Sequence, residues 1–132
     1  MLVIDASALL ELLLRTGLAD RLMHRALDPA TRLHAPHLVD VEVLQGLRRL
    51  LHRKQITALR AEQVLEDLSQ LLIERHPHQP LIARIWEMRD SLSAYDSAYV
   101  ALAEALAAPL LTCDGKLARA HGHRAAIELV AS

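Results

Sequence analysis

Aromatic side chains are almost absent from this sequence, which contains no phenylalanine, one tryptophan (Trp86) and two tyrosines (Tyr95 and Tyr99). Proteins that bind single-stranded nucleic acid on a platform of stacked rings need several aromatic side chains, so that class is excluded. Cysteine is just as scarce. The single cysteine, Cys113, excludes a disulfide-linked scaffold and a zinc ribbon, and it is typical of a protein from a reducing compartment.

The sequence also lacks an excess of one charge and a long apolar run. Fifteen Lys and Arg against 16 Asp and Glu give a net charge of −1, which excludes phosphate binding by bulk positive charge. The longest apolar run near the start, residues 6–14, is interrupted by Ser7 and Glu11 and is too short to cross a bilayer. No basic segment precedes it, so we expect no signal peptide, no membrane partner and a cytoplasmic location.

Leucine (28 residues) and alanine (21 residues) dominate the 132 positions, and this composition favours helices. No linker or repeat interrupts the chain, which predicts a single domain over residues 1–132. Periodicity and breakers predict helices over residues 7–15, 19–27, 38–52, 81–91 and 95–106, one that starts after Thr57, and a short one after Gly115. Apolar runs predict strands over residues 2–4, 33–35, 72–75 and 110–113, with an edge strand over 127–130. Alternating strands and helices predict an α/β fold with a parallel sheet covered on both faces.

Four acidic residues occupy unusual positions in this pattern. Asp5 and Asp114 directly follow predicted strands, at the sheet edge where parallel α/β proteins bind ligands. Asp96 shares a helix face with Tyr99, and Glu42 lies early in an apolar helix. Either strand-end acid alone is explained as a helix cap. Together, converging carboxylates would repel one another, and a divalent cation such as Mg²⁺ or Mn²⁺ would neutralise them. The spacing therefore predicts a metal site.

The segments around these acids resemble the motifs of PIN-domain ribonucleases, and more specifically those of the VapC toxins of bacterial toxin–antitoxin pairs. The resemblance covers nearly the whole chain and has all four motifs in order. The segments are Val3-Ile4-Asp5-Ala6-Ser7-Ala8, Val41-Glu42-Val43-Leu44, residues 94–103 (AYDSAYVALA) and residues 110–117 (LLTCDGKL).

The resemblance implies a PIN-like three-layer fold with strand order 3-2-1-4-5 and a Mg²⁺- or Mn²⁺-dependent endoribonuclease. It implies metal-site and catalytic roles for the four acids and supporting hydrogen-bond roles for Ser7 and Thr112. Asp5 and Asp96 are expected to ligate the metal, Glu42 to ligate it or orient the attacking water, and Asp114 to hold a second metal or its water. The implied partners are an RNA substrate and a cognate antitoxin, with a homodimer and a heterotetramer or larger complex with the antitoxin.

Other functions compete with this interpretation. A receiver-type phosphoacceptor would need a pair of acids after the first strand, and a haloacid-dehalogenase-like phosphatase would need an acid at position 7, where the sequence has Ser7. A PIN-like module that binds RNA or a protein without cutting it remains an alternative from another class. The complete set of four acids counts against a binder of polyanions, because it adds negative charge where the ligand is negative.

Several other side chains suggest chemistry and have a plainer interpretation. The pairs His76/His78 and His121/His123 lack further zinc ligands at finger spacing, so we expect both in exposed loops. Cys113 is expected to be a small core residue, and Trp86 to lie in the core or a dimer interface. Two groups of basic residues are candidates for phosphate contact or for solvated helix ends, namely residues 48–54 (RRLLHRK) and the pair Lys116 and Arg119.

Overall fold

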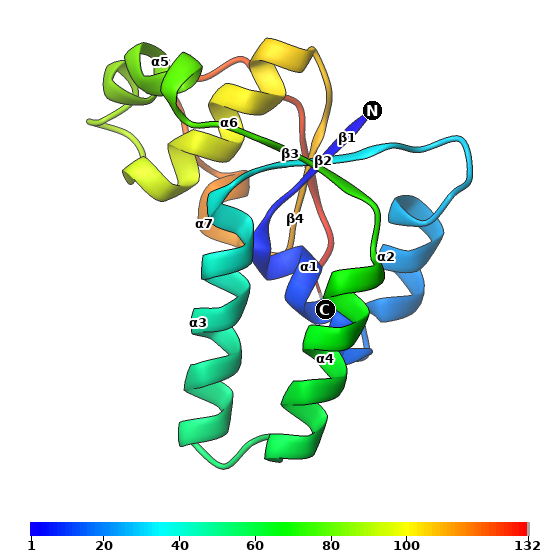
Figure 1. Cartoon of the computed structure of the whole chain (residues 1–132). Coiled ribbons are helices and arrows are strands. Elements are labelled where there is room, and N and C mark those ends of the chain that lie inside the picture. Colours follow the sequence, from blue (N-terminus) through cyan, green and yellow to red (C-terminus); the bar gives the residue numbers. More distant parts are fainter. Residues whose placement is uncertain (132) are drawn as a thin grey trace.

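A computed structural model describes residues 1–131 of the chain, and its centre is a five-stranded parallel sheet (Figure 1). The sheet order is β3-β2-β1-β4-β5, which confirms the expected order 3-2-1-4-5. The chain builds β1, β2 and β3 outward on one side and then returns to place β4 on the other side of β1. The strands are β1 (Leu2–Ile4), β2 (Leu33–Pro36), β3 (Ile73–His76), β4 (Leu110–Thr112) and β5 (Ile127–Leu129).

Helices cover both faces of the sheet, as the three-layer expectation requires. The helix α6 (Ala94–Leu106) packs against β1, β2 and β4, and α5 (Ile82–Glu87) packs against α6. The helix α1 (Ala6–Leu14) packs against α2, α3 and α4. Figure 1 shows α3 and α4 running side by side away from the sheet. The remaining elements are α2 (Ala19–Ala26), α3 (Leu38–His52), α4 (Ala58–Gln70), the 3₁₀ turn η1 (Gln79–Leu81) and α7 (Gly115–Ala118).

The core lies where the central strands meet α1 and α6. All three residues of β1 are fully buried, because helices cover both sides of that strand. Seven consecutive residues of α6, 97–103, are also buried, so this helix is enclosed on every side. Such a buried framework fixes the positions of the side chains at the ends of β1 and β4 and on α6. Among the residues that the structure describes, no helix is both long enough and apolar enough to cross a membrane.

Several expected elements differ from the structure by one residue at an end, and two differences have a clear physical reason. The third strand begins at Ile73 rather than at residue 72, because pairing with β2 starts opposite Leu33, and Leu72 beyond it is 90 % exposed. The helix expected over 81–91 is α5 alone, which ends at Glu87. Beyond it the chain turns, with two successive backbone N–H groups donating to the carbonyl of Met88. The side chain of Met88 is buried at this turn, which ties the turn to the core.

Candidate active site

Asp5 follows β1 directly and is held by three hydrogen bonds. Its Oδ1 accepts from the backbone N of Ala8 (2.9 Å) and from the Ser7 hydroxyl (2.7 Å). Its Oδ2 accepts from the Thr112 hydroxyl at the end of β4 (2.5 Å). The side chain therefore caps α1 and is also tied to the neighbouring strand. The cap and the candidate ligand are the same carboxylate, and only 6 % of the residue is exposed.

Ser7 and Thr112 join the ends of β1 and β4 into one network. The Ser7 hydroxyl accepts from the backbone N of Cys113 (3.0 Å), and the Thr112 hydroxyl accepts from the backbone N of Asp114 (2.9 Å). The family resemblance implied a supporting role for both hydroxyls, and the structure places both against Asp5. The network spans the two strands between which the sheet order reverses, which is the ligand-binding point of parallel α/β sheets.

Glu42 and Asp96 approach from two different helices. Glu42 lies in the second turn of α3, where its Oε1 accepts a 2.6 Å hydrogen bond from the hydroxyl of Tyr99 on α6. Asp96 lies in the first turn of α6, one helical turn before Tyr99 and therefore on the same face. Ser93 caps this helix by accepting from the backbone N of Asp96 (3.1 Å). The cap fixes where the Asp96 side chain begins.

Asp114 both caps a helix and lines the cavity that holds the other three acids. Its Oδ1 accepts from the backbone N of Lys116 (2.9 Å), so it caps the short helix α7. It also lines the same cavity as Asp5, Glu42 and Asp96. Capping therefore does not remove Asp114 from the acidic group.

All four predicted acids line one cavity of about 290 Å³. The cavity lies beside the carboxyl ends of β1 and β4 and is flanked by the helices α3 and α6. Its remaining lining comes from Ala6, Ser7, Leu10, Gly46, Arg49 and Tyr99. Gly46 allows α1 and α3 to approach closely here, because a Cβ at this position would lie 2.7 Å from Leu10 Cδ2. Of the basic segment 48–54, Arg49 is the residue at the cavity. Within residues 1–131 it forms no ion pair with the four acids.

Burial raises the pKa of three carboxyl groups in this cavity and so disfavours their ionised form. Burial raises the pKa of Asp5 to about 6, although its three hydrogen bonds act in the opposite direction and Asp96 adds repulsion. Burial also raises the pKa of Glu42, partly offset by the Tyr99 hydroxyl. The pKa of Asp96 is raised by burial first and then by the charge of Asp114. Oxygen donors that repel one another in a partly desolvated cavity match what a hard divalent cation binds, so the residues present fit such an ion.

Tyr99 is the residue of this site to which the sequence assigned no role. Its position three residues after Asp96 was visible, but a buried tyrosine on an apolar helix face is usually explained by packing. The contact with Glu42 joins residues 57 positions apart and depends on how α3 and α6 pack. The spacing of Glu42 and Tyr99 in the sequence does not indicate how these two helices pack.

The histidine and tryptophan expectations need correction. His76 is the last residue of β3 and not part of an exposed loop, and His78 is half-buried with its Nε2 accepting from the backbone N of Leu38 (3.0 Å). Trp86 is 66 % exposed, so it is not a core residue of the single chain, and its place in a dimer interface stays a prediction. The Arg89 guanidinium lies 4.8 Å from its ring centre.

Cys113 is half-buried and packs against the edge of the hydrophobic core. Burial raises the pKa of its thiol to about 11, and the nearby negative charge of Asp5 contributes to the increase. The thiol therefore stays protonated near neutral pH and is a poor nucleophile, since the thiolate is the reactive form.

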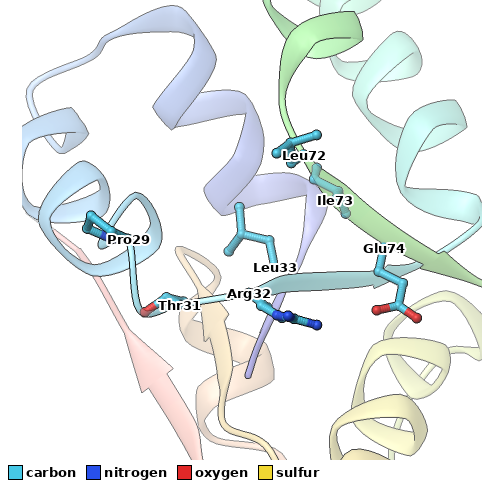
Figure 2. Close-up of a pocket in the computed structure, with 7 residues that line it drawn as sticks. All are labelled: Pro29, Thr31, Arg32, Leu33, Leu72, Ile73 and Glu74. Atoms are coloured by element: carbon cyan, nitrogen blue, oxygen red, sulfur yellow. The ribbon is translucent and has the colours of Figure 1, made fainter.

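A second cavity, of about 460 Å³, lies at the opposite edge of the sheet, where β2 and β3 begin. Figure 2 shows its lining, which includes Arg32, Leu33, Leu72 and Glu74. It contains one acid and lies at the amino ends of the strands, away from the edge where parallel sheets bind ligands. The smaller, acidic cavity is therefore the candidate active site.

Comparison with known proteins agrees with this geometry. Residues 2–122 match the family model of the PIN domain. The chain is 49 % identical over 117 residues to Ribonuclease VapC9 of Mycobacterium tuberculosis, covering 89 % of this chain and 88 % of that protein. It is 44 % identical over 131 residues to Ribonuclease VapC12 of the same species, covering 99 % and 100 %. The chain therefore belongs to the PIN-domain family, and within it to the VapC group.

Solved structures show the same fold. PAE2754 from Pyrobaculum aerophilum superposes with a TM-score of 0.68 at 25 % identity, covering 96 % of this chain and 81 % of that one. VapC20 of Mycobacterium tuberculosis, described as a toxin that cleaves the sarcin-ricin loop, superposes with a TM-score of 0.67 at 17 % identity, covering 89 % and 93 %. The second likeness supports the fold alone.

Proposed function

We propose that this protein is a metal-dependent endoribonuclease toxin that hydrolyses RNA phosphodiester bonds and is held in check by a cognate antitoxin. The observation that carries the proposal is the convergence of Asp5, Glu42, Asp96 and Asp114 on one cavity at the sheet's switch point. Relatives named ribonucleases, at 44–49 % identity over most of the chain, support the same substrate class.

Asp5 and Asp96 would hold the ion, which we propose to be Mg²⁺ or Mn²⁺. Both are hard cations that prefer carboxylate oxygens and retain water. When bound, such an ion supplies the Lewis acidity that activates water and stabilises negative charge on a phosphodiester. Glu42 would ligate or orient the attacking water, and Asp114 would extend the site from the β4 side.

The other polar residues of the cavity keep these acids in place. The hydroxyls of Ser7 and Thr112 hold both oxygens of Asp5, so its rotation would break hydrogen bonds on both sides. The Tyr99 hydroxyl donates to Glu42 Oε1, which leaves Oε2 available to the metal or the attacking water. Arg49, exposed at the cavity, is a cation placed to contact an RNA phosphate.

The antitoxin would cover the cavity and the apolar surface beside it. Val41 and Leu44 on α3 and Leu59 on α4 are 67 %, 47 % and 65 % exposed, which is unusual for large apolar side chains on neighbouring helices. We propose that apolar antitoxin residues pack along α3 while an antitoxin arginine enters the acidic cavity, where a guanidinium can form paired hydrogen bonds with carboxylates. Inhibition would then compete with metal. The toxin itself would form a homodimer, and a heterotetramer or larger complex with antitoxin.

The test is incubation of purified protein with total RNA in Mg²⁺ or Mn²⁺, with EDTA as the metal-free arm, followed by sequencing of the new RNA ends. Defined cut sites that disappear with EDTA and with the variants Asp5→Asn and Asp96→Asn support the proposal. Glu62→Gln, an exposed charge loss on α4 outside the cavity, is the matched control and should cut normally. RNA binding without any cut in metal would favour the non-catalytic PIN-like module.

The toxin role has a separate test. Expression of the protein alone should arrest growth, and co-expression with its antitoxin should restore it. Cleavage in vitro without harm at high expression would leave a nuclease that is not a toxin.

A further inference from the structure

Three metal-ligating side chains meet on the strands β2 and β3, outside the acidic cavity. In the sheet register His34 pairs with Glu74, and Pro36 pairs with His76. Side chains alternate between faces along a strand, so His34, Glu74 and His76 share one face of the sheet. His34 Nδ1 lies 2.9 Å from His76 Nε2 and 3.5 Å from Glu74 Oε2. All three ligand atoms lie within 4.8 Å of one another.

One hydrogen bond accounts for the contact between the two imidazoles, but it leaves the nearby Glu74 carboxylate without a ring proton of its own. A neutral imidazole nitrogen either donates one proton or accepts one. If His34 Nδ1 donates, two acceptors compete for its single proton. If it accepts from His76, its lone pair faces the carboxylate of Glu74. A cation at the centre would satisfy three lone pairs at once.

We propose that His34, Glu74 and His76 form a second metal site, specific for a divalent transition metal of the Zn²⁺ class. Two imidazoles and one carboxylate are a known type of ligand set for Zn²⁺, with Zn–N distances of about 2.0–2.1 Å and the remaining position open to water. Two nitrogens on a tetrahedral ion lie about 3.4 Å apart at such bond lengths. The pair seen here at 2.9 Å therefore needs to open by about half an ångström.

The site is reachable and chemically distinct from the acidic cavity. The Glu74 side chain is 63 % exposed and is one of the residues that line the second cavity (Figure 2). His34 is 96 % buried and supplies a fixed inner ligand. Nitrogen ligands select Zn²⁺, Co²⁺ or Ni²⁺ over Mg²⁺, whereas the four carboxylates suit Mg²⁺ or Mn²⁺. Two sites in one small domain would thus select two classes of ion.

Metal binding at this site would cross-link the edge strand β3 to its neighbour β2. Strand β3 is bonded on one side to β2 and has no strand on its other side in the described part of the chain. A metal held by His34 on β2 and by two residues of β3 would cross-link the two strands. The same segment meets the start of α3, because His37 N donates to the His76 carbonyl (2.9 Å). Metal binding should therefore raise the melting temperature.

The experiment is a calorimetric titration of Zn²⁺ into the untagged full chain carrying Asp5→Asn and Asp96→Asn, which disable the acidic cavity. We expect one Zn²⁺ per chain, not displaced by millimolar Mg²⁺. Adding His76→Gln or Glu74→Gln to this background should weaken Zn²⁺ binding at least tenfold. Adding His121→Gln, an exposed loop histidine outside the site, is the matched control and should not.

A second experiment uses wild-type protein saturated with Mg²⁺. Zn²⁺ should raise its melting temperature, and Co²⁺ should give the visible absorption of a low-symmetry nitrogen and oxygen site. Both signals should be lost in Glu74→Gln, whose exposed position makes it tolerant of substitution. Zn²⁺ affinity unchanged in both Glu74→Gln and His76→Gln would overturn the proposal, as would the absence of Zn²⁺ binding in the Asp5→Asn/Asp96→Asn background.

Discussion

The hydroxyl of Tyr99 on α6 donates a 2.6 Å hydrogen bond to Oε1 of Glu42 on α3. This bond connects two helices that approach the acidic cavity from different parts of the chain. Burial and the adjacent Glu42 carboxylate both raise the pKa of Tyr99, so the phenol remains a donor at all pH values relevant to the protein. In return, the bond counteracts part of the burial effect on the Glu42 pKa. Tyr99 therefore acts as a positioning residue for Glu42.

Tyr99→Phe tests this relationship. Loss of the hydroxyl should slow RNA cleavage roughly tenfold, as is typical when a partner of a metal-site ligand is removed. It should lower the free energy of unfolding by about 1 kcal/mol. The pH profile of cleavage should move to higher pH, because the Glu42 pKa rises without its donor. Tyr95→Phe, on an exposed tyrosine of the same helix, is the control. An unshifted profile with normal turnover would mean that Tyr99 only fills space.

Asp5→Asn should stabilise the metal-free protein near neutral pH. The pKa of Asp5 is raised from 3.8 to about 6, so folding favours its protonated form. The resulting stability is complete below pH 3.8 and is lost as the pH rises through about 6. The ionised group then costs up to about 3 kcal/mol, which the amide avoids. Melting temperatures of both proteins, measured in EDTA from pH 4 to pH 8, should diverge as the pH increases. A constant difference would contradict a strained carboxylate.

Metal affinity should follow the same ionisation with the opposite consequence. The ion binds the carboxylate and not the acid, so Mn²⁺ affinity of the wild-type protein should rise as pH increases through about 6. Saturating Mn²⁺ should raise the melting temperature of the wild type more than that of Asp5→Asn, because binding stabilises the folded state. Calorimetry at pH 5, 6, 7 and 8 measures the first effect. Equal thermal shifts in the two proteins would count against this site.

Arg49→Gln should weaken RNA binding more than it slows the chemical step. Arg49 lines the acidic cavity from α3, so its loss should raise KM several-fold with a smaller change in kcat. The slope of log affinity against log salt should decrease by roughly 0.7, as expected for one phosphate contact on single-stranded RNA. Arg48→Gln, on an exposed residue of the same helix that does not line the cavity, should leave both quantities near normal. Similar losses in the two variants would indicate a general charge effect.

The sequence predicted the sheet and the acidic group because both follow from local signals. Apolar runs that end just before Asp5 and Asp114 define strands and their carboxyl ends, whereas the sheet order was implied by the resemblance to PIN-domain ribonucleases. Even the ambiguity over helix caps was real, since both acids cap helices while lining the cavity.

What the sequence could not supply depends on contacts between distant elements. The pairing of Glu42 with Tyr99 requires the packing of α3 on α6, and the meeting of His34 with His76 requires the register of β2 and β3. The expected helix over 81–91 ends early because Met88 is buried at a turn, a constraint set by the core rather than by helix propensity. Trp86 is exposed because it lies on α5, a helix with no fully buried residue.

The rate of RNA cleavage as a function of Mn²⁺ concentration, measured for wild type and Asp96→Asn under single-turnover conditions, tests the central claim most directly. The account predicts saturable cleavage by the wild type that is abolished by EDTA and restored by excess Mn²⁺. For Asp96→Asn it predicts no cleavage, or cleavage that appears at far higher Mn²⁺ concentrations, with the fold intact by circular dichroism. Identical metal dependence in both proteins, or cleavage that persists in EDTA, would contradict a metal-dependent nuclease built on these four carboxylates.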